Sequence, residues 1–162
     1  MTNIKRKILF TTYILLGIVI FFAFMLRKSI WVADSIVLGF LLFIIYLARK
    51  QLNLTDFLFL LLSSLVLMHC FAVFGLFKIK IFGNEYDTYI HFYAGVVLVL
   101  VSFNYAMKFK ISIVETVLLT LFIALGIGLF NEIIEFLGYR LFGEGGRFVS
   151  IGPWRCWRNK RF

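Results

Sequence analysis

The chain has almost no proline and very little cysteine. Its one proline is Pro153, so no helix-breaking proline interrupts the apolar stretches before it. The two cysteines, Cys70 and Cys156, do not follow the spacing of a disulfide framework or of a zinc site. Small disulfide-stapled domains and cysteine-based zinc modules are therefore excluded.

Charge is also scarce. Charged residues make up 15% of the chain and hydrophobic residues 62%, with a mean hydropathy of +0.99, whereas a soluble domain is roughly half apolar. The first apolar run follows Lys5, Arg6 and Lys7, but it is long enough to span a bilayer and lacks a small-residue cleavage pattern. We therefore expect an integral membrane protein that retains its first helix.

Five apolar runs separated by short polar turns organise the sequence. A bilayer core of about 30 Å needs a helix of about 20 residues, and we predict transmembrane helices at residues 8–26, 30–48, 57–77, 87–107 and 113–140. Short connections make successive helices antiparallel. The predicted fold class is thus an all-α polytopic transmembrane bundle of five helices in residues 1–142, followed by a basic tail in residues 143–162.

The net charge of +9 is concentrated at the C-terminal end. Residues 140–162 carry six basic and one acidic side chain, which supplies over half of the excess. Basic segments beside membrane helices commonly contact anionic lipid. The expected partner is therefore the lipid bilayer, and nucleic-acid binding is not expected of a chain embedded in it.

Ionisable residues inside the fourth and fifth runs are the candidate functional groups. Asp87 and His91 are four residues apart and Glu132 and Glu135 are three apart, so each pair shares a helix face. Counting outward from the turn near residues 109–110 places Asp87 level with Glu132. Carboxylates with an imidazole suit Mn, Fe, Zn or Mg, so Asp87, His91, Glu132 and Glu135 form a candidate metal site.

Two further ionisable residues fall in the same half of the predicted bundle. Asp34 lies near the start of the second run, where a carboxylate ordinarily meets lipid headgroups. His69 lies in the third run, where a packed and hydrogen-bonded histidine is a simpler interpretation than a ligand. Neither residue is included in the candidate site.

The polar motifs carry a family resemblance. The first motif consists of Tyr86, Asp87, His91, Phe92 and Gly95, and the second of Asn131, Glu132, Glu135 and Phe136, followed by Gly143, Glu144 and Gly145. Together, over residues 80–148, they resemble the YjdF-like family of bacterial and archaeal multi-pass membrane proteins. The resemblance implies that Asp87, His91, Glu132 and Glu135 are recurrent polar positions, and it supplies no reaction. It also implies that fuller members have six or more helices.

The tail departs from that family pattern. Members of the family continue with an acidic stretch and another helix, whereas residues 154–162 here contain two tryptophans and four basic residues. Back-translation with AT-rich codons and a one-base shift gives an acidic Gly-Asp sequence instead. We therefore expect residues from about Trp154 onward not to be a native element. Alternatively, the tail is a cationic interfacial anchor.

Three functions remain open at this stage. The first is a divalent-cation site acting on a lipid-phase substrate, and the second is a proton- or ion-coupled transport or sensing element that uses the same acids and histidine as a relay. The third is a structural membrane subunit whose polar groups fix the helix register. No motif decides whether the protein is an enzyme.

The basic residues of the loops bear on orientation. Without the tail, the side of the bundle that carries the N-terminus has seven Lys and Arg residues against four on the other side. Counting the tail's six with those four reverses the balance to ten against seven. Leaving the tail out, the positive-inside rule favours a cytoplasmic N-terminus. The resemblance to the YjdF-like family implies a bacterial or archaeal plasma membrane.

Overall fold

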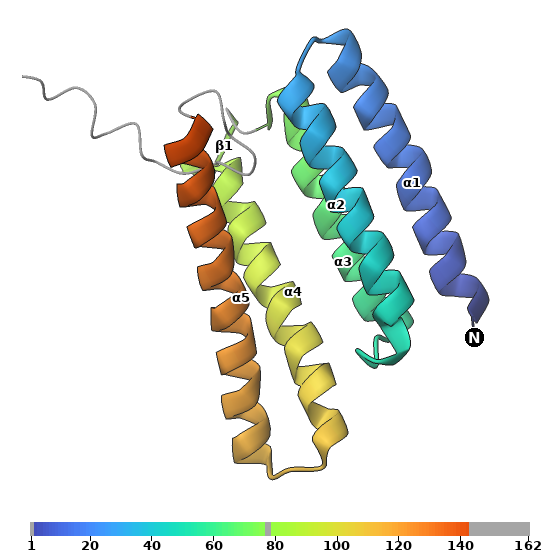
Figure 1. Cartoon of the computed structure of the whole chain (residues 1–162), viewed down its shortest axis with the longest axis vertical. Coiled ribbons are helices and arrows are strands. Elements are labelled where there is room, and N and C mark those ends of the chain that lie inside the picture. Colours follow the sequence, from blue (N-terminus) through green and yellow to red (C-terminus); the bar gives the residue numbers. More distant parts are fainter. Residues whose placement is uncertain (1, 77–78, 143–162) are drawn as a thin grey trace, which may run out of the picture.

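The computed structural model of the chain describes residues 2–76 and 79–142 and is built almost entirely from helices (Figure 1). Its five α-helices are α1 (Thr2–Met25), α2 (Ser29–Leu47), α3 (Asp56–Phe71), α4 (Tyr86–Ala106) and α5 (Ile113–Phe142). Short 3-10 helices are η1 (Ala48–Lys50), η2 (Ala72–Phe74) and η4 (Met107–Phe109). The predicted all-α bundle of five helices is confirmed. The tail predicted for residues 143–162 lies outside the described residues.

Each helix lies beside the helix that follows it in the chain. Helices α1, α2 and α3 pack together, α4 lies against α3, and α5 packs against α4 to form an antiparallel hairpin (Figure 1). Short turns between successive helices force this alternation of direction, as the sequence predicted. The starts of α2 and α4 and the end of α3 therefore lie at one end of the bundle.

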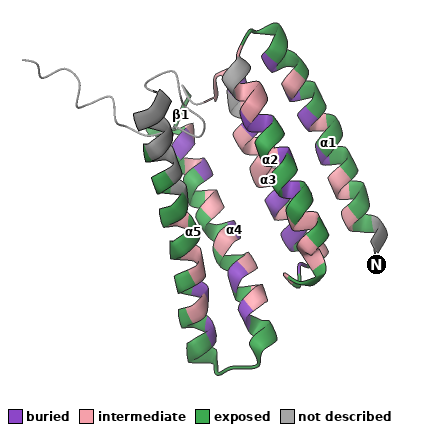
Figure 2. Ribbon diagram, viewed as in Figure 1, coloured by how far each residue is buried: buried purple, intermediate pink, exposed green. Residues whose placement is uncertain are grey.

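Among the residues that the structure describes, four segments are long and apolar enough to cross a membrane. They are Ile4–Met25, Trp31–Lys50, Tyr86–Phe109 and Ile113–Phe130. Many large apolar residues of these helices are exposed. Exposed positions recur along each of the helices in Figure 2. In water such a surface would be a severe liability, but in hydrocarbon it is the expected one.

Helix α3 differs from its prediction. The apolar run predicted a helix over 57–77, but the α-helix ends at Phe71 and has 16 residues, which is about 24 Å at about 1.5 Å per residue. The chain then tightens into η2 and turns at Gly75, whose φ is +91°. Lys28 Nζ donates a hydrogen bond of 2.5 Å to the Val73 carbonyl oxygen in this segment. Lys28, from the turn between α1 and α2, thus pairs with a carbonyl oxygen just beyond the end of α3.

Helix α1 also differs, at its start. The prediction began at residue 8, after the basic residues, whereas the helix begins at Thr2 and carries Lys5, Arg6 and Lys7 on its first turns. Lys5 Nζ donates to the Leu54 carbonyl oxygen at 2.6 Å and lies 3.4 Å from Asp56 Oδ1. These contacts with the start of α3 explain why the helix continues through the charged residues.

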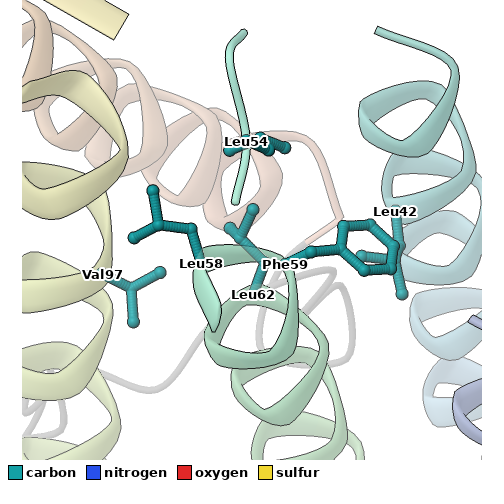
Figure 3. Close-up of a cluster of buried hydrophobic side chains, with 6 residues drawn as sticks. All are labelled: Leu42, Leu54, Leu58, Phe59, Leu62 and Val97. Carbon is teal, nitrogen blue, oxygen red and sulfur yellow. The ribbon is translucent and has the colours of Figure 1, made fainter. Parts of the chain in front are cut away.

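The buried side chains form two clusters along α3. One joins α2, α3 and α4 through Leu42, Leu58, Phe59, Leu62 and Val97, with Leu54 from the preceding turn (Figure 3). The other joins α1 to the end of α3 through Leu16, Val19, Ala23, Cys70 and Val73. Helices α1, α2 and α4 therefore pack around α3.

A small hairpin connects α3 to α4. Strands β1 (Lys80–Ile81) and β2 (Asn84–Glu85) pair in antiparallel fashion, and both turn residues, Phe82 and Gly83, have positive φ. Positive φ at both central positions characterises the tight turn that suits a two-residue hairpin. The hairpin brings the chain directly into α4 at Tyr86.

Candidate functional site

Asp87 and His91 lie one turn apart at the start of α4. The Asp87 carboxylate is in the first turn, where the helix dipole favours negative charge. Its Oδ1 atom is 3.4 Å from His91 Nε2, so the predicted sharing of one helix face is confirmed. The Asp87 side chain is 11% exposed and the His91 side chain is 45% exposed. The pair therefore joins a buried acid to an imidazole that reaches the outer surface.

The Asp87 carboxylate is incompletely satisfied. Its Oδ1 atom is buried and has no hydrogen-bond partner in the described part of the chain. A buried carboxylate oxygen without a hydrogen bond is costly, by about 1–3 kcal/mol or more. A proton or a cation bound at this oxygen would remove that cost.

Of the two carboxylates predicted on α5, only the side chain of Glu132 is among those that the structure describes. Glu132 is exposed, and the side chain of Glu135 lies outside what the structure describes. Within residues 2–76 and 79–142, no group of three or more His, Cys, Asp or Glu side chains is placed to hold a metal ion. The described part of the chain thus supplies two of the four predicted ligands, Asp87 and His91, as a close pair.

A second acid–histidine pair, which the sequence did not predict, joins α2 to α3. His69 Nε2 lies 2.8 Å from Asp34 Oδ2, and the two side chains are 15% and 7% exposed. The Trp31 ring lies beside the imidazole, with 6.3 Å between ring centroids. The assignment of Asp34 to the headgroup region is therefore wrong, because this carboxylate points into the bundle.

The surroundings of this pair explain its position. His69 is in the last turn of α3, and Asp34 is in the first half of α2. Ser35 and Cys70, the next residues along the two helices, are both buried at the same interface. The interpretation of His69 as a hydrogen-bonded packed histidine is confirmed, with Asp34 as its partner.

Both acid–histidine pairs lie at the same end of the bundle. The Tyr86 hydroxyl donates to the Met68 carbonyl oxygen at 3.3 Å, which places the first turn of α4 beside the residue before His69. Two turns into α4, the Tyr93 hydroxyl lies 2.6 Å from Ser64 Oγ. His69 near the end of α3 and the Asp87–His91 pair at the start of α4 therefore lie at similar depth.

Comparison with known proteins gives the family. The family described as predicted membrane protein (DUF2238) matches residues 7–152, which include both acid–histidine pairs and both α5 glutamates. No curated protein and no solved structure matches the chain. The match covers most of the sequence and agrees with a bundle of membrane-spanning helices. The chain therefore belongs to the DUF2238 family of predicted membrane proteins.

Proposed function

We propose that this multi-pass membrane protein performs proton-coupled transport or sensing and that the Asp34–His69 pair holds the proton. The observation that carries the proposal is the 2.8 Å contact between Asp34 Oδ2 and His69 Nε2 inside the bundle. Ionisable residues within membrane helices are costly, and proton relays are one of the functions for which membrane proteins keep them. This contact gives one proton two neighbouring atoms to which it could bind, as a relay requires.

A proton leaving this pair needs an acceptor at similar depth. Asp87 and His91 on α4 lie at the same end of the bundle, and His91 reaches the outer surface. We propose that this second pair connects the first to the membrane surface. We also propose that the protein is YjdF-like, that it lies in the plasma membrane and that its N-terminus is cytoplasmic.

Infrared difference spectroscopy tests the proton site directly. Purified protein in lipid vesicles is compared between acidic and alkaline buffer, and we expect a carboxyl band that disappears in Asp34→Asn. Asp56→Asn is the matched control, because Asp56 lies at the start of α3 beside Lys5. An identical spectrum for the wild type and Asp34→Asn overturns the proposal. Proton flux into the same vesicles then separates transport from sensing.

Asp87 favours a second candidate function. Its buried Oδ1 atom lacks a hydrogen bond, and a divalent cation held by Asp87, His91, Glu132 and Glu135 would satisfy it. Oxygen ligands with an imidazole suit Mn, Fe, Zn or Mg, and such an ion would polarise an oxygen of a lipid-phase substrate. The protein's own residues would bind and orient the ion.

Metal analysis of purified protein tests this candidate. We expect about one equivalent of metal in the wild type and loss of it in both Asp87→Asn and Glu132→Gln. Glu115→Gln is the control. Glu115 is on α5, as Glu132 is, but it caps the first turn of that helix together with Ser112. Equal metal content in all four proteins rejects the metal site. A purely structural role predicts lower thermal stability for His91→Ala and no metal in any of them.

A further inference from the structure

The turn between α1 and α2 forms a hollow at the end of two membrane spans. Phe24, Met25, Arg27, Lys28 and Val32 line it, and its volume is about 520 Å³. The apolar span Ile4–Met25 ends at this point and the next begins at Trp31, so the hollow lies where hydrocarbon gives way to headgroups. Its volume is within the range of about 300–1,000 Å³ that small-molecule sites occupy.

The turn does not need its two basic side chains in order to close. The backbone N–H of Arg27 donates to the Phe24 carbonyl oxygen, and that of Lys28 donates to the Ala23 carbonyl oxygen, each at 2.9 Å. Neither side chain forms an ion pair with a carboxylate in the described parts of the chain. Two positive charges therefore face the hollow without a neutralising acid.

Lys28 is held in place at the hollow. One of its ammonium protons is donated to the Val73 carbonyl oxygen at 2.5 Å, which fixes the nitrogen beside the end of α3. An ammonium group has three protons, so two remain for another acceptor. The neighbouring Arg27 is exposed, and its guanidinium can form two parallel hydrogen bonds to one phosphate group.

We propose that this hollow binds one anionic phospholipid. The lipid phosphate contacts Arg27 and Lys28, and the first part of an acyl chain lies along Phe24, Met25 and Val32. The hollow matches a phospholipid in both charge and polarity. Its cations lie at headgroup depth, and its apolar residues extend toward the bilayer interior. Basic pockets between membrane helices recognise lipid headgroups in this way. None of the residues that line the hollow belongs to either acid–histidine pair, and the variants tested below leave both pairs unchanged, so the function proposed above and this site can fail independently.

Thermal unfolding of the detergent-purified full chain tests the proposal. Added phosphatidylglycerol is expected to raise the melting temperature, whereas phosphatidylcholine and inorganic phosphate are expected to have little effect. Arg27→Gln is expected to weaken the apparent phosphatidylglycerol affinity by about tenfold, as loss of a charge-assisted hydrogen bond of about 1.5 kcal/mol predicts. Lys110→Gln is the matched control, because Lys110 is exposed, lies at the opposite end of the bundle and also has a positive φ, of 52° against 55° for Arg27.

Each outcome decides the matter. Wild-type-like affinity in Arg27→Gln overturns the site, as does an equal response of the wild type to phosphatidylcholine. An equal response to inorganic phosphate shows an anion site rather than a lipid site and also overturns the proposal. If Arg27→Gln does not fold, native mass spectrometry of the wild type from vesicles of both lipids replaces it. Preferential retention of one phosphatidylglycerol then supports the site, and retention without preference overturns it.

Discussion

Asp34 Oδ2 on α2 lies 2.8 Å from His69 Nε2 on α3, although 35 positions separate the two residues. The contact joins two helices inside the bundle, and both side chains are largely buried. Removing one member leaves the other buried and unsatisfied, whereas removing both members leaves only a packing defect. The pair therefore makes a prediction about stability that does not depend on its function.

The stability losses of the two single replacements should add up to more than the loss caused by the double replacement. We expect Asp34→Ala and His69→Ala each to lower the free energy of unfolding by about 1–3 kcal/mol, and the double variant to lower it by less than their sum. Unfolding in mixed micelles with increasing dodecyl sulfate measures all four proteins. Strict additivity would show that the two side chains do not interact.

The tyrosines of α4 should differ in their importance. The Tyr93 hydroxyl is 2.6 Å from Ser64 Oγ at the interface of α3 and α4, so Tyr93→Phe should cost about 0.5–1.5 kcal/mol. Tyr89→Phe is the control, because the Tyr89 hydroxyl donates at 2.7 Å to the Ile81 carbonyl oxygen in an exposed position. We expect a smaller loss there, measured by thermal unfolding. A larger loss for Tyr89→Phe would contradict the packing of α4 on α3.

Sequence spacing predicted the local pair and missed the distant one for a physical reason. Asp87 and His91 are four residues apart in one helix, so they are neighbours whatever that helix packs against. Asp34 and His69 meet only because α2 and α3 are rotated toward each other. Each helix is apolar on nearly every side, so the sequence carries no stripe that reveals this rotation. The position of Glu132 relative to α4 was unpredictable for the same reason.

The end of α3 was equally hidden. The run of apolar residues continues to Phe77, and composition alone extends the helix through it. The helix ends at Phe71, and the Lys28 ammonium satisfies the carbonyl oxygen of Val73, 45 positions away in the sequence. A lone lysine in a turn does not indicate which carbonyl it will reach. Helix existence was therefore predictable, and this boundary was not.

Gly39 marks the close approach of α1 and α2. A Cβ atom at this position would lie 3.5 Å from Leu16 Cδ1 and 3.6 Å from Tyr13 Cε1, which is ordinary contact distance. Gly39→Ala should therefore fit and stabilise the helix by up to about 1 kcal/mol. Gly39→Leu should separate the helices and disturb the 2.6 Å hydrogen bond from the Tyr13 hydroxyl to the Gly39 carbonyl oxygen. Thermal unfolding checks both variants, and a stability loss in Gly39→Ala would contradict the observed helix spacing.

The orientation of the bundle gives the last prediction. The starts of α2 and α4 lie at the end that carries Arg27, Lys28 and Lys80, while the start of α1 and the ends of α2 and α4 carry more basic residues. By the positive-inside rule the second group should face the cytoplasm. An alkaline phosphatase fusion after Gly83 in the hairpin should be active outside, and one after Asn53 between α2 and α3 should be inactive. Green fluorescent protein at the same two positions should give the opposite pattern. Phosphatase activity at Asn53 with none at Gly83 would invert the bundle and place both acid–histidine pairs in the cytoplasmic half of the membrane.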